Sequence, residues 1–412
     1  MKIAIVGAGI AGISTALELA RDGHQVTVYE KKNAATEGAS FAPGGWLSPC
    51  AAASLSTPGT GMPLQTLKGT DLLQASNLIG SATWRWMRQW RTRAKPTTTE
   101  PTPYAQALSH LEAYSQSLRW QTDDAPEVTA ERRLGSLLIL RTPAEVAFWQ
   151  THLPQLQAQG TPCQLLDAPQ ACTLEPGLSQ GIAWTHAVHF PRGESINPRL
   201  WAQHLRTQTQ ALGVQWHTST PVQRIHHHPV GVEVAGKLHP FDAIVICTGE
   251  LHELLPNHPS LPLMPIWGYS VTAPVRDAQL APRTAILDWQ QQATISRLGQ
   301  RVRITAGLEM GTTAAQPHHT PTLQRMYRLL NDWFPGGVHL SSPQVQVWRG
   351  ARHHLPDGLP ATGASHWPGI WLNLAHGSHG ASLASGCARA LTDMLSGRTP
   401  AIDMTPFNPQ RF

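Results

Sequence analysis

The first thirty residues change period twice, and each change predicts a new element. Residues 3–6 are a short β-branched, apolar run, and the following segment repeats its apolar positions at helical spacing as far as Arg21. Gly23 then interrupts the pattern, and "QVTVY" at 25–29 alternates polar and apolar residues before Glu30. The order predicts a strand, a helix and a second strand.

Further along the chain the same two periods predict both helices and strands. Helical spacing covers 70–92, 104–118, 143–158, 197–212, 320–333 and about 381–395, and strand-like runs cover 133–140, 241–249, 267–274, 284–289 and 301–307. A further strand, a turn and another strand are expected before residue 229, with Val222 on the second of these strands. The chain is expected to be α/β, or α+β overall.

Glycines give the first unit a chemical meaning. Gly7, Gly9 and Gly12 have the GxGxxG spacing directly after the first strand, and Glu30 follows eighteen residues after the last of them. Such glycines allow a tight turn, close approach of the backbone to a pyrophosphate, and close packing of helix on strand. Free amides at the helix N-terminus attract the phosphates, and the acid accepts hydrogen bonds from the ribose. We predict a dinucleotide site.

Two later segments favour FAD over NAD. After Glu30 the loop 31–49 carries Ser40, Gly44 and Gly45 beside Trp46 and Leu47, which suits close approach of the backbone to a flat ring. Near the end of the chain a glycine-rich turn at 376–380 precedes another helix, and its N-terminus offers a second anion or dipole contact. A Gly-Pro surface loop and an ordinary helix cap are the simpler interpretations of these two segments.

Composition narrows the class of protein. The chain has 412 residues, of which 41% are hydrophobic and 14% charged, so it is expected to fold into two domains. Its 31 Lys and Arg exceed its 26 Asp and Glu but are scattered, so nucleic acid is not an expected partner. Five widely spaced cysteines indicate neither a disulfide framework nor a zinc ribbon. We expect no bound metal and no membrane-spanning segment.

In order and spacing, six segments resemble the FAD-dependent D-amino acid oxidase superfamily, and within it the bacterial D-amino acid dehydrogenases. They are "IAIVGAGIAGISTAL", "ASFAPGGWLSP", "GYSVTAP", "ILDWQQQATISRLGQRVRITAGLE", "GARHHLPDGLPATG" and "IWLNLAHGSHGASLASGCARALTDMLSGRTPAI". The resemblance implies a glutathione-reductase-like FAD-binding Rossmann domain, interleaved with an antiparallel-sheet substrate domain. We assign 1–50, 190–262 and 345–412 to the first domain, and 51–189 and 263–344 to the second.

The resemblance also implies site residues. Those expected to bind FAD are Gly7, Ala8, Gly9, Ile10, Ala11, Gly12, Glu30, Lys31, Ser40, Gly44, Gly45, Trp46, Leu47, Val222, Gly249, His376, Ser378, His379, Gly380, Ala381 and Ser382. Arg352 is expected to hold the substrate carboxylate with help from Tyr269. His353 or His354 could receive an amine proton, although packing histidines explain the pair equally well.

The sequence departs from the family at three positions near the expected meeting of flavin and substrate. His353 replaces a proline, Ala375 a glycine, and Ala381 an aromatic residue. The implied reaction is oxidation of the CH–NH bond of a small amino acid by hydride transfer to flavin, giving a keto acid and ammonia. Open alternatives are an oxygen-using glycine or sarcosine oxidase, a D-proline or hydroxyproline dehydrogenase, and a non-catalytic flavin-bound subunit of a complex.

The segment "WRWMRQWRTRAK" at 84–95 raises the question of a membrane. On a helix Trp86, Met87, Trp90 and Ala94 share one face and arginines fill much of the rest, a pattern typical of helices at a membrane interface. A quinone of the respiratory chain is then a candidate electron acceptor. The expected location is cytoplasmic, with peripheral contact at the inner face of the cytoplasmic membrane. A helix of the substrate domain fits the same segment.

Overall fold

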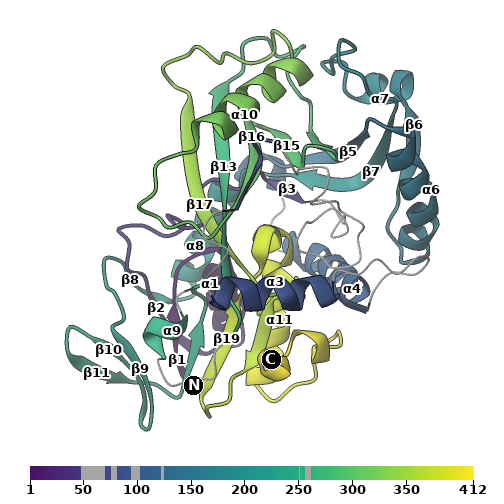
Figure 1. Cartoon of the computed structure of the whole chain (residues 1–412). Helices are drawn as coiled ribbons and strands as arrows, with labels where there is room; N and C mark the ends of the chain where they lie inside the picture. Colours follow the sequence, from purple (N-terminus) through teal and green to yellow (C-terminus); the bar gives the residue numbers. More distant parts are fainter. Residues whose placement is uncertain (48–69, 76–80, 94–102, 122–124, 250, 256–260) are drawn as a thin grey trace.

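Two large sheets dominate the computed structural model, which describes residues 1–47, 70–75, 81–93, 103–121, 125–249, 251–255 and 261–412. In Figure 1 the larger sheet occupies the upper part of the view and the smaller one the lower part, and helix α3 (Ser81–Arg93) crosses between them. Ala94, which we expected on the apolar face of this helix, lies outside the described residues. The predicted α/β fold class is confirmed.

The smaller sheet has six strands from three distant parts of the chain. Their order is β18 (Ala361–Ala364), β19 (Ile370–Leu374), β12 (Ala243–Ile246), β1 (Lys2–Val6), β2 (Gln25–Tyr29) and β8 (Gln215–His217). All neighbouring pairs are parallel except β18 with β19. The central strands are almost wholly buried, as parallel strands covered on both faces must be.

Helices cover one face of this sheet and a small hairpin sheet covers the other. Ile3 and Ile5 pack with residues of α1 (Ile10–Arg21) and α11 (Gly380–Leu395). Ala4 and Val6 point the opposite way and pack with the sheet of β9 (Arg224–His227), β10 (Val230–Val234) and β11 (Lys237–Pro240). The alternation of side chains along β1 therefore supplies both layers.

The larger sheet has the order β17 (Gln346–His354), β13 (Met264–Pro274), β16 (Arg301–Met310), β15 (Ala293–Leu298), β14 (Ala285–Asp288), β5 (Arg133–Leu140), β7 (His186–Ser195) and β3 (Trp46–Leu47). Two short strands join it at the side, β4 (Leu73–Ala75) on β16 and β6 (Gln164–Asp167) on β7. The sheet is mostly antiparallel, although β14 with β5 and β16 with β4 are parallel.

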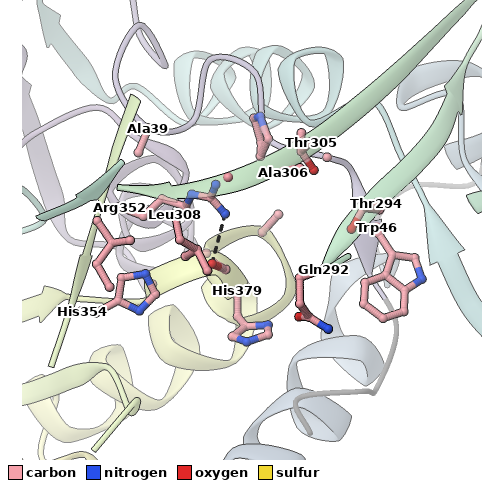
Figure 2. A pocket seen from close by; sticks show the side chains of 18 of the residues that line it. Ala39, Trp46, Gln292, Thr294, Thr305, Ala306, Leu308, Arg352, His354 and His379 are labelled. Atoms are coloured by element: carbon pink, nitrogen blue, oxygen red, sulfur yellow. Dashed lines mark hydrogen bonds between the residues drawn. The ribbon is translucent and has the colours of Figure 1, made fainter. Parts of the chain in front are cut away.

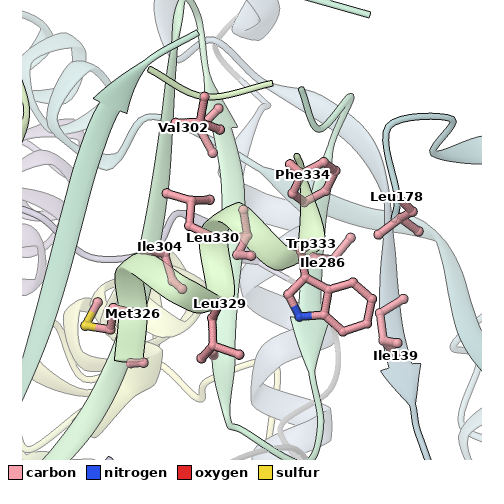
Figure 3. Packing of buried hydrophobic residues seen from close by; sticks show 14 of the residues in the cluster. Ile139, Leu178, Ile286, Val302, Ile304, Met326, Leu329, Leu330, Trp333 and Phe334 are labelled. Atoms are coloured by element: carbon pink, nitrogen blue, oxygen red, sulfur yellow. The ribbon is translucent and has the colours of Figure 1, made fainter. Parts of the chain in front are cut away.

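One face of the larger sheet is closed by α10 (Thr320–Trp333). Met326, Leu329, Leu330 and Trp333 recur at three- and four-residue intervals and pack on residues of β14 and β16, as Figure 3 shows. All four side chains are at most 1% exposed. The face that α10 covers is therefore filled with apolar side chains.

The remaining helices are α4 (Pro103–Arg119), α5 (Pro126–Thr129), α6 (Pro143–Ala158), α7 (Ala168–Leu174), α8 (Pro198–Ala211) and α9 (Leu251–Leu254). The helix expected over 70–92 is wrong in its first part, because Leu73–Ala75 form β4 along the edge of β16. Val222 lies in the connection before β9 and not on a strand. The structure describes no helix that is both long and apolar enough to cross a membrane.

The predicted domain boundaries remain predictions, but two strands bear on them. β17 was assigned with the cofactor domain, yet it hydrogen-bonds to β13 in the larger sheet. β7 begins before residue 190 and also belongs to the larger sheet. Residues 190–195 and 346–354, which we assigned to the FAD-binding domain, therefore lie in the larger sheet.

Candidate active site

A deep cavity lies between the two sheets, on the face of the larger sheet that α10 does not cover. Its lining comes from the loop 39–47, helix α3, strands β13, β16 and β17, and the turn that opens α11, part of which is shown in Figure 2. Described lining residues from the two ends of the cavity include Ile10, Ser40, Gly44, Gly45, Trp46, Leu47, Trp86, Met87, Trp90, Arg352, His354, Ser378, His379, Gly380, Ala381 and Ser382. Residues far apart in the sequence thus share one hollow.

The first turn has the shape that a dinucleotide needs. Gly7 has φ of +103°, and a Cβ on Gly12 would lie 2.0 Å from the Gly7 carbonyl oxygen, so a side chain fits at neither position. The amide of Ala8 donates to Glu30 Oε2 at 2.7 Å, which brings that acid to the turn. Ala11 and Gly12 are buried in the first turn of α1, while Lys31 is exposed beyond Glu30. Gly9, the N-cap residue of α1, offers no side-chain acceptor to the helix amides.

The loop 40–47 is held against helix α1 and the larger sheet. Ser40 Oγ accepts a hydrogen bond from the Ile10 amide at 3.1 Å, and Arg303 Nη1 donates to the Pro43 carbonyl at 3.0 Å. Gly45 has φ of +74°, and a Cβ there would lie 2.1 Å from the Ile196 carbonyl oxygen. The pKa of Arg303 falls to about 10 because of burial, so this arginine remains charged at neutral pH. The small-residue loop therefore lies at a fixed position in the cavity wall.

The turn that opens α11 faces the cavity from the other side. No side chain caps the helix at His379, so the amides that follow are free to face a ligand. His376 does not line the cavity. Its Nε2 lies 3.0 Å from Asn373 Oδ1, and burial lowers its pKa to about 4. His376 therefore supports the turn from behind, in the neutral form.

Arg352 extends from β17 into the cavity. A Cβ at Gly268 would lie 1.9 Å from Arg352 Nη2, so the guanidinium occupies space that only a glycine leaves open. Its Nη1 donates to Ser378 Oγ at 3.0 Å, which is the dashed bond in Figure 2. Burial lowers the pKa of Arg352, although a guanidinium keeps its charge. Among the lining residues that the structure describes, Arg352 is the only Lys or Arg, and none is Asp or Glu.

Of the two adjacent histidines of β17, His354 faces the cavity and His353 faces the opposite way. Successive residues of a strand point to opposite faces, so His354 shares a face with Arg352. The His353 ring instead lies against Gly249, where an added Cβ would be 2.0 Å from His353 Nδ1. Of the two histidines proposed to receive an amine proton, only His354 lines the cavity, so His353 is withdrawn as a site residue. Gly249 lies behind β17 and outside the cavity lining.

Neutral imidazoles flank Arg352. Burial lowers the pKa of His354 well below its usual range, and the positive charge of Arg352 adds to the effect. Burial likewise lowers the pKa of His379 to about 4, again with a contribution from Arg352. Within the described part of the chain, His354 Nδ1 and His379 Nε2 are buried without a hydrogen-bond partner.

Tyr269 is not brought to the cavity. It lies on β13 with its ring in the core under α10, and its hydroxyl donates to Glu309 and accepts from the His319 amide at 2.8 Å. Burial raises the pKa of Tyr269 to about 12, and the bond to Glu309 adds to the rise. We therefore remove Tyr269 from the expected substrate contacts.

Helix α3 also turns its apolar face inward. Trp86 is 4% exposed, its Nε1 donates to the His354 carbonyl at 3.2 Å, and Met87 and Trp90 line the cavity with it. The face that we expected in a membrane interface therefore covers the site. The sequence pattern alone could not decide between a helix at a membrane interface and a helix that packs over the site, because each requires an apolar stripe on the helix.

Several lining residues were missed from the sequence. Gln292, Thr294, Thr305, Leu308 and Met310 come from β15, β16 and the turn before β15. Alternation along β16 would have placed some of them on one face, but it does not reveal which face meets the cofactor.

The structure offers no metal centre among its described residues, where no three His, Cys, Asp or Glu side chains converge. His226 pairs with an acidic residue, since its Nε2 lies 2.8 Å from Glu233 Oε2 across the β9–β10 hairpin. One histidine and one carboxylate form a hydrogen-bonded pair, which is too few ligands for a metal site.

A nucleotide-binding sheet whose first turn opens toward a cavity under a second sheet is the architecture of a flavin-dependent oxidoreductase. The chain belongs to the family of FAD dependent oxidoreductases (DAO), which matches residues 2–394. It is 31% identical over 430 aligned positions to the D-amino acid dehydrogenase of Cereibacter sphaeroides (strain ATCC 17029 / ATH 2.4.9), covering 100% of this chain and 95% of the relative.

Solved structures share the fold at lower identity. Glycine oxidase from Geobacillus kaustophilus superposes with a TM-score of 0.74 at 21% identity, covering 100% of this chain and 98% of that one. L-Proline dehydrogenase from P. horikoshii has the same TM-score at 17% identity, covering 100% and 97%.

The cofactor is FAD, and the residues present fit it. Close contacts with the Cys247, Gly7 and Ile196 carbonyls exclude side chains at Gly7, Gly12 and Gly45, which keeps these turns tightly packed beside the cavity. The N-cap residues of α1 and α11 make no side-chain cap, so the amides of these helix N-termini, apart from the Ile10 amide that bonds to Ser40, would face the polar groups of the cofactor. Ser40 and Gly44 line the cavity, and with Gly9 they would complete the cradle. The predicted family and cofactor are confirmed.

Proposed function

We propose that this protein oxidises the CH–NH bond of α-amino acids, and that its substrates are D-amino acids. The observation that supports this function is Arg352, the one Lys or Arg side chain among the described residues that line the cavity, which include no Asp or Glu. A planar guanidinium holds a carboxylate through two parallel hydrogen bonds. The relative from C. sphaeroides is named a D-amino acid dehydrogenase, which supports the choice of configuration.

The chain's own part in the reaction is binding and orientation. Arg352 would hold the substrate carboxylate, and its bond to Ser378 fixes the guanidinium against the turn that opens α11. Holding the substrate this way presents its Cα to the cofactor, and such positioning lowers the entropic part of the barrier. Bound FAD supplies the oxidising chemistry by accepting a hydride from that carbon.

The surroundings of Arg352 also bear on the protonation states of the neighbouring histidines and of the substrate amine. His354 and His379 are neutral at physiological pH because their pKa values are lowered, so they do not compete with Arg352 for the carboxylate. No acidic side chain is present among the described lining residues to stabilise an ammonium group. We therefore expect the substrate amine to react in its neutral form. The imine product would then be hydrolysed to a keto acid and ammonia.

The test is anaerobic reduction of the purified, yellow protein. Addition of D-amino acids should bleach the flavin absorbance, and the matching L-amino acids should not. A protein that takes up no FAD, or whose flavin is reduced by neither series, contradicts the proposal and favours a non-catalytic flavin-bound subunit. Reduction by glycine or sarcosine with rapid reoxidation by oxygen would favour the amine oxidase alternative, and reduction by D-proline or hydroxyproline alone would favour the proline-type dehydrogenase.

For the electron acceptor we propose a quinone of the respiratory chain, which implies a cytoplasmic protein with transient contact at the inner face of the cytoplasmic membrane. The apolar face of α3 is already occupied, so the contact would use its exposed Trp84, Arg85, Arg88 and Arg91. Cationic side chains favour an anionic lipid surface. Replacing the three arginines by glutamine should abolish binding to anionic liposomes and leave reduction by substrate unchanged. Binding that persists would remove this helix from the contact.

A further inference from the structure

We propose that the cavity selects amino acids with an uncharged, apolar side chain of medium or large size, and that charged side chains are rejected. This inference rests on the proposed function and adds the substrate class. Its basis is a wall of apolar side chains directly beside Arg352.

The wall is continuous and comes from four elements. Trp86, Met264, Ile266 and Met310 form one buried cluster, and Leu73, Met87, Trp90 and Leu308 pack against it. Seven of these eight residues also line the cavity, the exception being Met264. Two methionines and two tryptophans give a surface that is large, and the methionines can adapt to ligands of different shape.

The apolar wall adjoins Arg352, which we call the carboxylate clamp. Ile266 lies directly opposite Arg352 in the register of β13 and β17, on the same face of the sheet. Trp86 is fastened to the next inward-facing residue of β17 through its bond to the His354 carbonyl. A substrate whose carboxylate is held by Arg352 therefore meets this wall with its side chain. The other end of the cavity is lined by residues of 40–47 and 377–382, which we assign to the flavin site.

Nothing in the described lining can neutralise a charge on the substrate side chain. Acidic residues are absent from it, and its one permanently charged group is the arginine that the α-carboxylate already uses. The two histidines are neutral. A charge moved from water into such a wall loses its hydration without gaining a partner, whereas an apolar side chain gains from burial.

The experiment compares pairs of substrates that differ in charge and little in size. We would measure kcat/KM for D-norleucine against D-lysine and for D-methionine against D-glutamate, with the purified flavin-bound protein at pH 8. The apolar member of each pair should be favoured by about 100-fold or more, in the range that one unsatisfied polar group can produce. A ratio below tenfold in either pair overturns the inference.

A gain-of-function variant tests the position of the wall. Met87→Glu places a carboxylate in it and should raise the ratio of kcat/KM for D-lysine over D-norleucine by at least tenfold, and Met310→Glu is the second variant if the first fails to bind flavin. Val128→Glu is the matched control, because Val128 is 78% exposed on the surface. A ratio that stays at the wild-type value in both cavity variants contradicts the assignment of the wall.

Failure of this inference can be told from failure of the proposed function. If neither member of any pair reduces the flavin in either configuration, the proposed function fails and the inference falls with it. If charged and apolar D-amino acids react equally well, the proposed function stands and only the inference falls.

Discussion

The two ends of the cavity are built in different ways. The end proposed for the flavin is lined by Ile10 and by residues of the loop 39–47 and the turn 377–382, many of them small. The substrate end is lined by bulky side chains from α3, β4, β13 and β16. A flat cofactor of fixed shape is met by backbone, which few substitutions can alter. A substrate is met by side chains, each of which can be exchanged without moving the chain.

Removing the clamp should damage only the substrate end. Arg352→Ala should lower kcat/KM by about 1,000-fold, equivalent to about 4 kcal/mol, because the carboxylate loses its only cationic partner in the described lining. The flavin absorbance of the purified variant should be unchanged. Exposed Arg276→Ala is the control and should keep the parent kinetics. Loss of flavin from the Arg352 variant would mean that the two ends are not separable.

A single methyl group should damage the flavin end. Gly12→Ala places a Cβ 2.0 Å from the Gly7 carbonyl, and the overpacking should cost about 3 kcal/mol in the free energy of unfolding together with loss of bound FAD. Urea unfolding and flavin content measure both effects. Gly38→Ala in the same region meets nothing within 4 Å and should behave like the parent. Equal behaviour of the two variants would contradict the close packing of turn and helix.

The turn behind the flavin end should respond to pH. The pKa of His376 is lowered to about 4 in the folded protein, against an ordinary value near 6.5, so below pH 6.5 the unfolded chain takes up a proton that the native one does not. The unfolding free energy should therefore fall by about 1.4 kcal/mol per pH unit for this histidine as pH drops from 6.5 toward 4. His376→Asn should remove this component, with exposed His110→Gln as the control. Identical pH profiles for all three proteins would contradict the burial of His376.

A substitution outside both ends of the cavity should change only the free energy of unfolding. Thr142 caps α6, since its hydroxyl accepts from the Glu145 amide and Glu145 bonds back to the Thr142 amide. Thr142→Ala should cost about 1 kcal/mol in urea unfolding and leave kcat/KM and flavin content unchanged. Thr151→Ala, in an exposed part of the same helix, is the control. Altered kinetics in the Thr142 variant would show that α6 acts on the site.

The flavin end was more accessible to sequence reasoning than the substrate end. Its glycines follow from local geometry, because a turn that admits no Cβ must be glycine wherever it occurs. Ile10, Ser40, Trp46 and the 378–382 turn all line the cavity, and their contact with FAD stays a prediction. At the substrate end Arg352 was expected, but its neighbours Trp86 and Met310 were not.

The predictions that His353 and Tyr269 lie in the site failed for the same reason. His353 and His354 are adjacent, and only the register of β17 on β13 decides that His354 faces the cavity. Tyr269 is polar and lies on a strand of the site, yet its face of β13 is covered by α10, where Glu309 and the His319 amide satisfy its hydroxyl. A shift of one residue exchanges the two faces of a strand, and the sequence of a strand with polar residues on both faces does not fix which one is buried.

By itself the sequence determined the α/β class and the glycine turn with Glu30 beside it, because these depend on local spacing. Arg352 came from the resemblance to a known family, and its contact with the substrate stays a proposal. The tertiary structure decided the rest. In the folded protein the apolar face of α3 packs over the cavity. His354 and not His353 lines the cavity, and Ile266 lies opposite Arg352 in the pairing of β13 with β17. Such contacts join segments far apart in the chain, and packing between two sheets, not local propensity, sets which of them meet.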